Sequence, residues 1–202
     1  MKRLLREIRS CDACREFLAH PPRPVLSIDS KSKVLIIGQA PGKKVHQTGV
    51  PWDDRSGAIL RGWLGVDAAT FYEVKNFAIV PMGFCYPGRG ATGDLPPRPE
   101  CAKKWHPVVF PELKKTELTL LVGWYAQKYY LGKNIRPTLT QTVRNFDAYL
   151  PQFFPIVHPS PRNGIWLRKN DWFEKEVVPE LRSMVRTIIQ ASPALRPGQR
   201  IK

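Results

Sequence analysis

Four short apolar runs divide the chain, and a glycine or a histidine follows each of them. The runs cover residues 34–37, 77–82, 118–122 and 153–157. Bulky apolar side chains, many of them β-branched, dominate these runs, as they do in strands that are buried on both faces. The pattern therefore predicts four short buried strands.

Segments in which apolar residues recur at helical spacing separate these runs. One opens the chain, where Leu4, Leu5 and Ile8 share a side of an amphipathic helix. Others are expected near 56–64, 67–73 and 124–131, over 171–190, and at 101–113 with breaks near Pro107 and Pro111. Strands that alternate with helices predict an α/β fold, a three-layer α/β/α sandwich around a four-stranded, mainly parallel sheet.

The length of 202 residues suits one domain, which we place at residues 1–190. The remaining residues, 191–202, are basic, contain proline and lack apolar periodicity, so we expect a flexible tail there. No apolar run approaches the roughly 18 residues that a membrane-spanning helix needs, and no signal peptide follows the basic start. A cytoplasmic protein is therefore expected, and we expect it to be monomeric.

Basic residues outnumber acidic ones by a wide margin. Lys and Arg total 32 against 17 Asp and Glu, so the formal net charge is +15. This charge exceeds what solubility requires, which makes a polyanion such as a nucleic acid the expected partner. A basic surface without such a partner is the alternative.

The loop after the first apolar run combines features of a ligand site. Pro41 and Gly42 predict a tight turn whose backbone can approach a ligand closely, and Trp52 and the pair Asp53-Asp54 follow before the next helix. Ligands of parallel α/β sheets usually bind at such loops. An ordinary connection, with Asp54 capping the helix and Trp52 in the core, would account for the same residues.

A second loop, at residues 158–163, makes the pattern more specific. GQAPG at 38–42 and HPSPRN at 158–163 are similar to the two signature motifs of the uracil-DNA glycosylase superfamily. The resemblance implies an enzyme of base excision repair, which hydrolyses the N-glycosidic bond of uracil, or of a related deaminated base, in DNA. Such an enzyme turns the damaged nucleotide out of the duplex into a pocket.

The resemblance also implies roles for residues of the two loops. Trp52 lies where the superfamily places the ring that stacks on the base, and His158 would donate a hydrogen bond to the base carbonyl oxygen. Backbone N–H groups around Gln39 and Ala40 of the first loop are further candidate donors to the base. The other substrate-binding residues that we expect are Gly42, Ser160 and Arg162. Pro161 and Arg162 would form the wedge that fills the space left in the base stack.

Three positions depart from the usual pattern of the superfamily. Ala40 stands where the best-known members carry a water-activating Asp, and Gln39 stands where iron–sulfur members carry Glu. Pro81 stands where the iron–sulfur members carry an Asn that reads the uracil edge. These departures leave the identity of the excised base open.

Replacement carboxylates lie later in the first loop. We expect Asp53 to position the attacking water and Asp54 to cap the following helix, with the reverse assignment open. His46 lies between the turn and these carboxylates, and a solvated loop histidine is the expected state.

Four cysteines, at Cys11, Cys14, Cys85 and Cys101, form a C-x2-C pair followed by two single residues. Structural disulfides are not expected in a cytoplasmic chain. Four thiolates suit either tetrahedral zinc or a 4Fe-4S cluster, which spacing alone does not separate. The pattern resembles that of the iron–sulfur, family 4 type of the superfamily, which implies a 4Fe-4S cluster. Four unligated buried thiols are the alternative.

Two functions from different classes therefore remain. The first is a monofunctional DNA glycosylase. The second is a catalytically weak or inert iron–sulfur protein that binds nucleic acid and retains the glycosylase fold. A zinc-binding module without a base pocket is a third reading of the cysteines.

Overall fold

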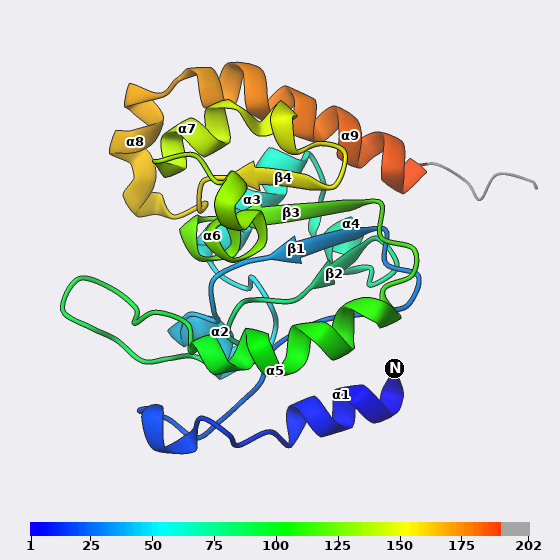
Figure 1. Cartoon of the computed structure of the whole chain (residues 1–202), viewed down its shortest axis with the longest axis vertical. Coiled ribbons are helices and arrows are strands. Elements are labelled where there is room, and N and C mark those ends of the chain that lie inside the picture. Colours follow the sequence, from blue (N-terminus) through cyan, green and yellow to red (C-terminus); the bar gives the residue numbers. More distant parts are fainter. Residues whose placement is uncertain (191–202) are drawn as a thin grey trace, which may run out of the picture.

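The computed structural model describes residues 1–190, and the predicted tail at 191–202 lies outside the described residues. A parallel four-stranded sheet forms its centre (Figure 1). The strand order is β2 (Phe77–Ile79), β1 (Val34–Ile37), β3 (Leu118–Val122) and β4 (Phe153–Ile156). The predicted α/β fold is confirmed.

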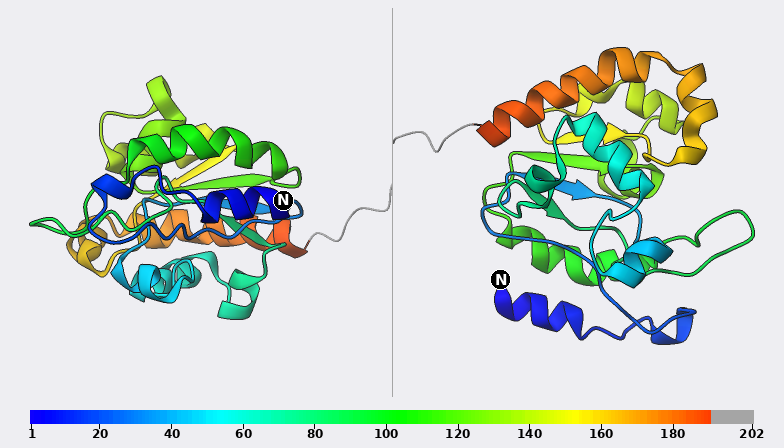
Figure 2. Two further views of the ribbon diagram at one scale, coloured as in Figure 1. Left: turned by 90° about the horizontal axis from the view of Figure 1, so that it is seen from below. Right: turned by 180° about the vertical axis from the view of Figure 1, so that it is seen from behind.

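Helices cover both faces of this sheet (Figures 1 and 2). Side chains alternate along β1, so that Val34 and Ile36 join one core and Leu35 and Ile37 join the other. The core around Val34 includes residues of α3 (Arg55–Leu64), α4 (Ala68–Tyr72), α7 (Leu139–Arg144) and α9 (Val178–Gln190). The core around Leu35 includes residues of α1 (Lys2–Arg9), α5 (Pro99–Val109) and α6 (Trp124–Leu131).

Several elements differ from the predicted ones. Strand β2 ends at Ile79, although the N–H groups of Val80 and Met82 still donate to carbonyls of the chain at β1. Three short helices, α2 (Lys43–Thr48), α7 and α8 (Gly164–Lys169), lie in segments without predicted structure. A π-helical turn, Phe173–Val177, precedes α9.

The predicted break of the helix at Pro107 is wrong. Helix α5 runs without interruption through Pro107, and only a 3-10 turn, Phe110–Glu112, follows it. Proline removes the hydrogen bond to the carbonyl four residues earlier, which belongs to Lys103. Both residues are exposed, so water can hydrate that carbonyl and the helix continues.

His106 joins α5 to the rest of its core. Its Nε2–H donates to the carbonyl oxygen of Pro81 over 3.0 Å, and its Nδ1 accepts from the hydroxyl of Tyr130 in α6. A neutral imidazole protonated on Nε2 can form both contacts. Burial accordingly lowers the pKa of His106 to about 4, against the weaker opposing effect of the Pro81 carbonyl.

This burial predicts a loss of stability in acid. An unfolded histidine binds a proton near pH 6.5, whereas His106 in the folded chain does so only near pH 4, so stability falls as the pH drops between these values. The shift corresponds to about 3 kcal/mol at most. The free energy of unfolding, measured with denaturant, should fall between pH 7 and pH 4 by about this amount more in the wild type than in His106→Gln, because glutamine has no titrating ring. Equal losses in the two proteins would contradict the assignment.

No helix in the described part of the chain is long and apolar enough to cross a membrane.

Candidate active site

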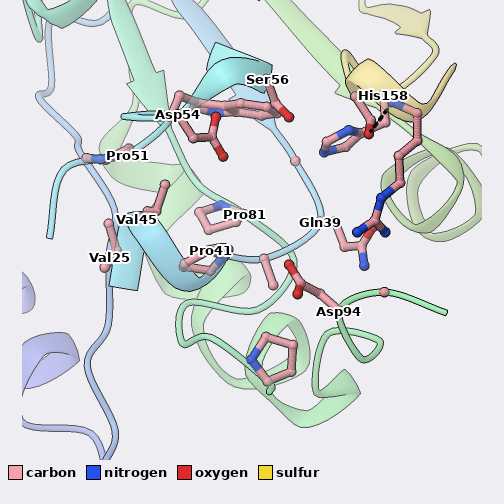
Figure 3. A pocket seen from close by; sticks show the side chains of 18 of the residues that line it. Val25, Gln39, Pro41, Val45, Pro51, Asp54, Ser56, Pro81, Asp94 and His158 are labelled. Atoms are coloured by element: carbon pink, nitrogen blue, oxygen red, sulfur yellow. Dashed lines mark hydrogen bonds between the residues drawn. The ribbon is translucent and has the colours of Figure 1, made fainter. Parts of the chain in front are cut away.

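A cavity of about 590 Å³ opens at the carboxyl ends of the strands (Figure 3). Most of its lining comes from three segments that are far apart in the sequence: residues 38–56, part of the long loop at 83–98, and the loop after β4 at 158–163. Because the strands are parallel, the loops that follow them meet at one edge of the sheet. The cavity is therefore where a ligand of this fold is expected.

Most of the sequence-predicted site residues line this one cavity. The structure brings together Gln39, Ala40, Gly42, Trp52, Asp54, His158, Ser160 and Arg162. Asp53 and His46 do not line it. The two motif loops thus form opposite parts of one site, as the resemblance implies.

The indole of Trp52 is held in place by its neighbours. Its ring lies against Gly38, where an added Cβ would come within 2.9 Å of Trp52 Cζ2. Its backbone has a positive φ of 57°, and the carbonyl oxygen accepts a long bond of 3.4 Å from Arg61 Nη1. Gly57 allows this turn, since a Cβ there would lie 1.8 Å from the same oxygen. Trp52 is therefore a rigid aromatic wall and not simply a core residue.

The ring of His158 packs beside that of Trp52 on the cavity lining. The two ring centroids are 5.5 Å apart, and the planes are tilted by 33°. The carbonyl of His158 accepts from Asn163 Nδ2 over 2.7 Å, which fixes the loop around it. Burial lowers the pKa of His158, while the charges of Asp54 and Asp94 act in the opposite direction. The imidazole is therefore neutral near pH 7 and can donate one N–H to a ligand.

The two adjacent carboxylates of the first loop have different surroundings. Asp54 caps α3, because its Oδ1 accepts from the Gly57 N–H over 2.8 Å, and it also lines the cavity. Asp53 lies outside the lining, is partly exposed and forms an ion pair of 3.6 Å with Lys44. Asp54 is therefore the helix cap, as expected, but Asp54 and not Asp53 is the carboxylate that reaches the cavity.

His46 is also placed differently from the expectation. Its ring packs against those of His20 and Tyr86, with centroid distances of 5.4 and 5.9 Å, and these two rings are also stacked on each other. Burial lowers the pKa of His46, with further lowering from His20 and Arg23. The ring is thus packed against other rings beside the cavity instead of being solvated in an open loop.

Arg162 and Ser160 shape the loop after β4. Ser160 Oγ accepts from the Arg162 N–H over 3.2 Å and starts a 3-10 turn, Pro161–Asn163. Arg162 Nη1 donates to the carbonyl of Thr92 over 3.2 Å, which connects this loop to the long loop. The residues expected to form the wedge therefore stand at the rim of the cavity.

One acidic residue of the cavity was missed by the sequence interpretation. Asp94 belongs to the long loop, lines the cavity, and accepts a bond of 3.4 Å from the hydroxyl of Tyr86 at its Oδ1. Pro81 also lines the cavity, at the carboxyl end of β2. Only the unusual length of the loop signalled a role for this segment, because such loops in compact domains are usually functional.

The four cysteines line a second, smaller cavity. Cys11 and Cys14 come from the segment after α1, Cys85 from the long loop, and Cys101 from α5. All four are free, and the Phe84 N–H donates to Cys101 Sγ over 3.3 Å. Within residues 1–190, no three His, Cys, Asp or Glu side chains are grouped closely enough to hold a single metal ion.

The chemistry of these thiols fits a bound cationic group. Burial, together with a smaller effect of charge on the other cysteines, raises the pKa of Cys85 to about 11 and that of Cys101 to about 12. Without a positive neighbour these thiols stay protonated at pH 7. Iron or zinc supplies positive charge that holds such sulfurs as thiolates.

The geometry of the larger cavity agrees with a comparison against protein families. The model of the family described as the Uracil DNA glycosylase superfamily matches residues 27–182. The matched segment covers most of the chain and contains both motif loops, Asp94 and all four strands. The chain therefore belongs to the uracil DNA glycosylase superfamily.

Proposed function

We propose that this protein is a monofunctional DNA glycosylase that hydrolyses the N-glycosidic bond of uracil, or of a related deaminated base. The observation that carries the proposal is that Trp52 and His158 lie side by side in the lining of one cavity at the carboxyl edge of the sheet. An aromatic face and a neutral hydrogen-bond donor are what a flipped base requires. Superfamily membership supports glycosylase chemistry in general.

The residues of the cavity divide the work of bond cleavage. Stacking on Trp52 holds the flipped base, and the amide of Gln39 offers a donor and an acceptor to its polar edge. As the bond to the sugar breaks, negative charge develops on the base and positive charge on the sugar. The neutral His158 donates to the base oxygen as that charge grows, which stabilises the transition state more than the bound substrate.

DNA is the expected partner of this cavity. The net charge of +15 supplies general attraction to phosphates, and Arg162 at the rim is placed to meet the DNA backbone. A wedge at this rim would occupy the space that the flipped base leaves in the stack. A cytoplasmic, monomeric enzyme remains the prediction for the cell.

The competing function is a protein that binds DNA without cleaving the bond. A labelled oligonucleotide with one uracil, treated with the protein and then with alkali, separates the two. Alkali-dependent strand cleavage at the uracil supports the glycosylase. Binding without cleavage at uracil, hypoxanthine or xanthine supports the inert binder.

We further propose that Cys11, Cys14, Cys85 and Cys101 hold a 4Fe-4S cluster. Each thiolate of such a cluster binds a different iron, so the sulfurs line a cavity instead of meeting at one point. When bound, the cluster would join the segment after α1 to the long loop and α5. Its role is therefore structural: it fixes the long loop that contributes to the larger cavity.

Protein purified without oxygen should be brown and contain about four iron atoms per chain. Cys85→Ser should lose most of the iron and lower the melting temperature, because the long loop loses its attachment. Iron analysis, visible absorption and thermal unfolding measure these effects. A colourless protein with about one zinc per chain would indicate the zinc alternative instead.

A further inference from the structure

Two carboxylates reach the cavity wall beside Gly42 from separate elements. Asp54 comes from the start of α3 and Asp94 from the long loop (Figure 3). A Cβ added at Gly42 would lie 3.5 Å from Asp94 Oδ2 and 3.9 Å from Asp54 Oδ2. Both oxygens therefore border the same spot, next to the tight turn that follows β1.

Each carboxylate is fixed through its other oxygen. Asp54 Oδ1 accepts from the Gly57 N–H over 2.8 Å, and Asp94 Oδ1 accepts from the Tyr86 hydroxyl over 3.4 Å. These bonds hold the side chains while the Oδ2 atoms face the cavity. Two acceptor oxygens around one point suit a water molecule, which donates two hydrogen bonds.

The pair also lies close to His158. The negative charges of Asp54 and Asp94 both raise the pKa of the imidazole against the effect of burial. The carboxylates are thus near the group that contacts the base. A water held between them would stand near the sugar of a flipped nucleotide, where positive charge develops in the transition state.

We propose that Asp94 accepts the proton of the attacking water, that Asp54 is the second acceptor for that water, and that Tyr86 is a positioning residue for Asp94. The proposal rests on the glycosylase function proposed above. The first motif loop has no carboxylate at Gln39 or Ala40, so the long loop supplies one from a distant part of the sequence.

The helix cap explains why Asp94 and not Asp54 takes the proton. Protonation of Asp54 would weaken the bond from Gly57 and remove a negative charge from the start of α3, where it is favourable. Protonation of Asp94 affects only the longer bond from Tyr86. Protonation of Asp94 therefore destabilises the folded chain less than protonation of Asp54 would.

The reaction balances without a further reagent. The electron pair of the bond between C1′ and the base nitrogen leaves with the base, and the water oxygen forms the new bond to C1′. The water proton passes to the Asp94 carboxylate, which later releases it to solvent. The departing base anion, held by His158, takes a proton from solvent on release.

The test compares asparagine variants, because asparagine keeps the oxygen that accepts from Tyr86 or from Gly57 while losing the charge. Asp94→Asn should slow single-turnover excision from a uracil-containing duplex by about 100-fold. The pH profile of the rate should lose the acidic limb that the wild type shows, while affinity for the duplex stays unchanged.

Three further variants complete the comparison. Asp54→Asn and Tyr86→Phe should lose less activity than Asp94→Asn and keep the acidic limb. Asp53→Asn, next to the site but outside the cavity, should match the wild type. An Asp94→Asn rate within threefold of the wild type, with the acidic limb retained, would overturn the proposal and leave the glycosylase function intact. A wild type that excises no base would overturn both.

Discussion

Replacement of His158 by alanine is expected to slow single-turnover excision of uracil by about 10² to 10³, which corresponds to roughly 3–4 kcal/mol. The imidazole is neutral near pH 7 because burial lowers its pKa, and it lines the cavity beside Trp52. Its N–H acts on the base oxygen only once charge has developed there. The rate should therefore fall while the affinity for DNA stays nearly the same.

A matched variant separates this role from packing. His158→Gln keeps an N–H donor of similar reach, so part of the rate should return, whereas both variants lose the ring contact with Trp52. Thermal unfolding of each protein shows whether the fold is retained. A His158→Ala rate within threefold of the wild type, in a folded protein, would mean that the loop after β4 does not stabilise the base anion.

Gly57→Ala is expected to destabilise the protein by about 3 kcal/mol and to reduce excision sharply. The added Cβ would lie 1.8 Å from the carbonyl oxygen of Trp52, so the backbone at Trp52 has to move. That movement displaces the aromatic wall of the cavity and disturbs the cap bond from Gly57 to Asp54. Chemical denaturation and single-turnover kinetics measure the two effects.

Gly62→Ala is the matched control on the same helix. A Cβ at Gly62 meets nothing within 4 Å, and alanine favours a helix over glycine by about 1 kcal/mol. The control should therefore be slightly more stable than the wild type and equally active. Equal stability and activity of the two alanine variants would contradict the inferred constraint on Trp52.

The sequence predicted the strands well because each apolar run ends at a residue that stops it. Gly38 and Gly123 follow β1 and β3, whose bounds agree with the prediction. The end of β2 was predicted three residues too late, since residues 80–82 remain buried and bonded to the chain at β1 after the strand ends. The unbroken α5 depends on solvent at Lys103, which a sequence pattern does not reveal.

The site was predictable only where its residues belong to local motifs. Trp52 and His158 lie in the two loops, and their meeting follows from the parallel order of the strands. Asp94 lies in an irregular loop, and its position depends on Tyr86, Thr92 and Arg162. Whether Asp53 or Asp54 reaches the cavity depends on the backbone conformation at Trp52, where φ is positive, and local sequence propensity does not determine that conformation.

The most direct test of the proposed glycosylase is a count of products in one turnover. Excess wild-type protein is mixed with a duplex that contains one uracil, and free uracil and abasic sites are measured in the same samples over time. Hydrolysis of the N-glycosidic bond predicts that both appear together in equal amounts, with the strand intact until alkali is added. A duplex that is bound but releases no uracil, and no other deaminated base placed at that position, would contradict the function proposed for this cavity.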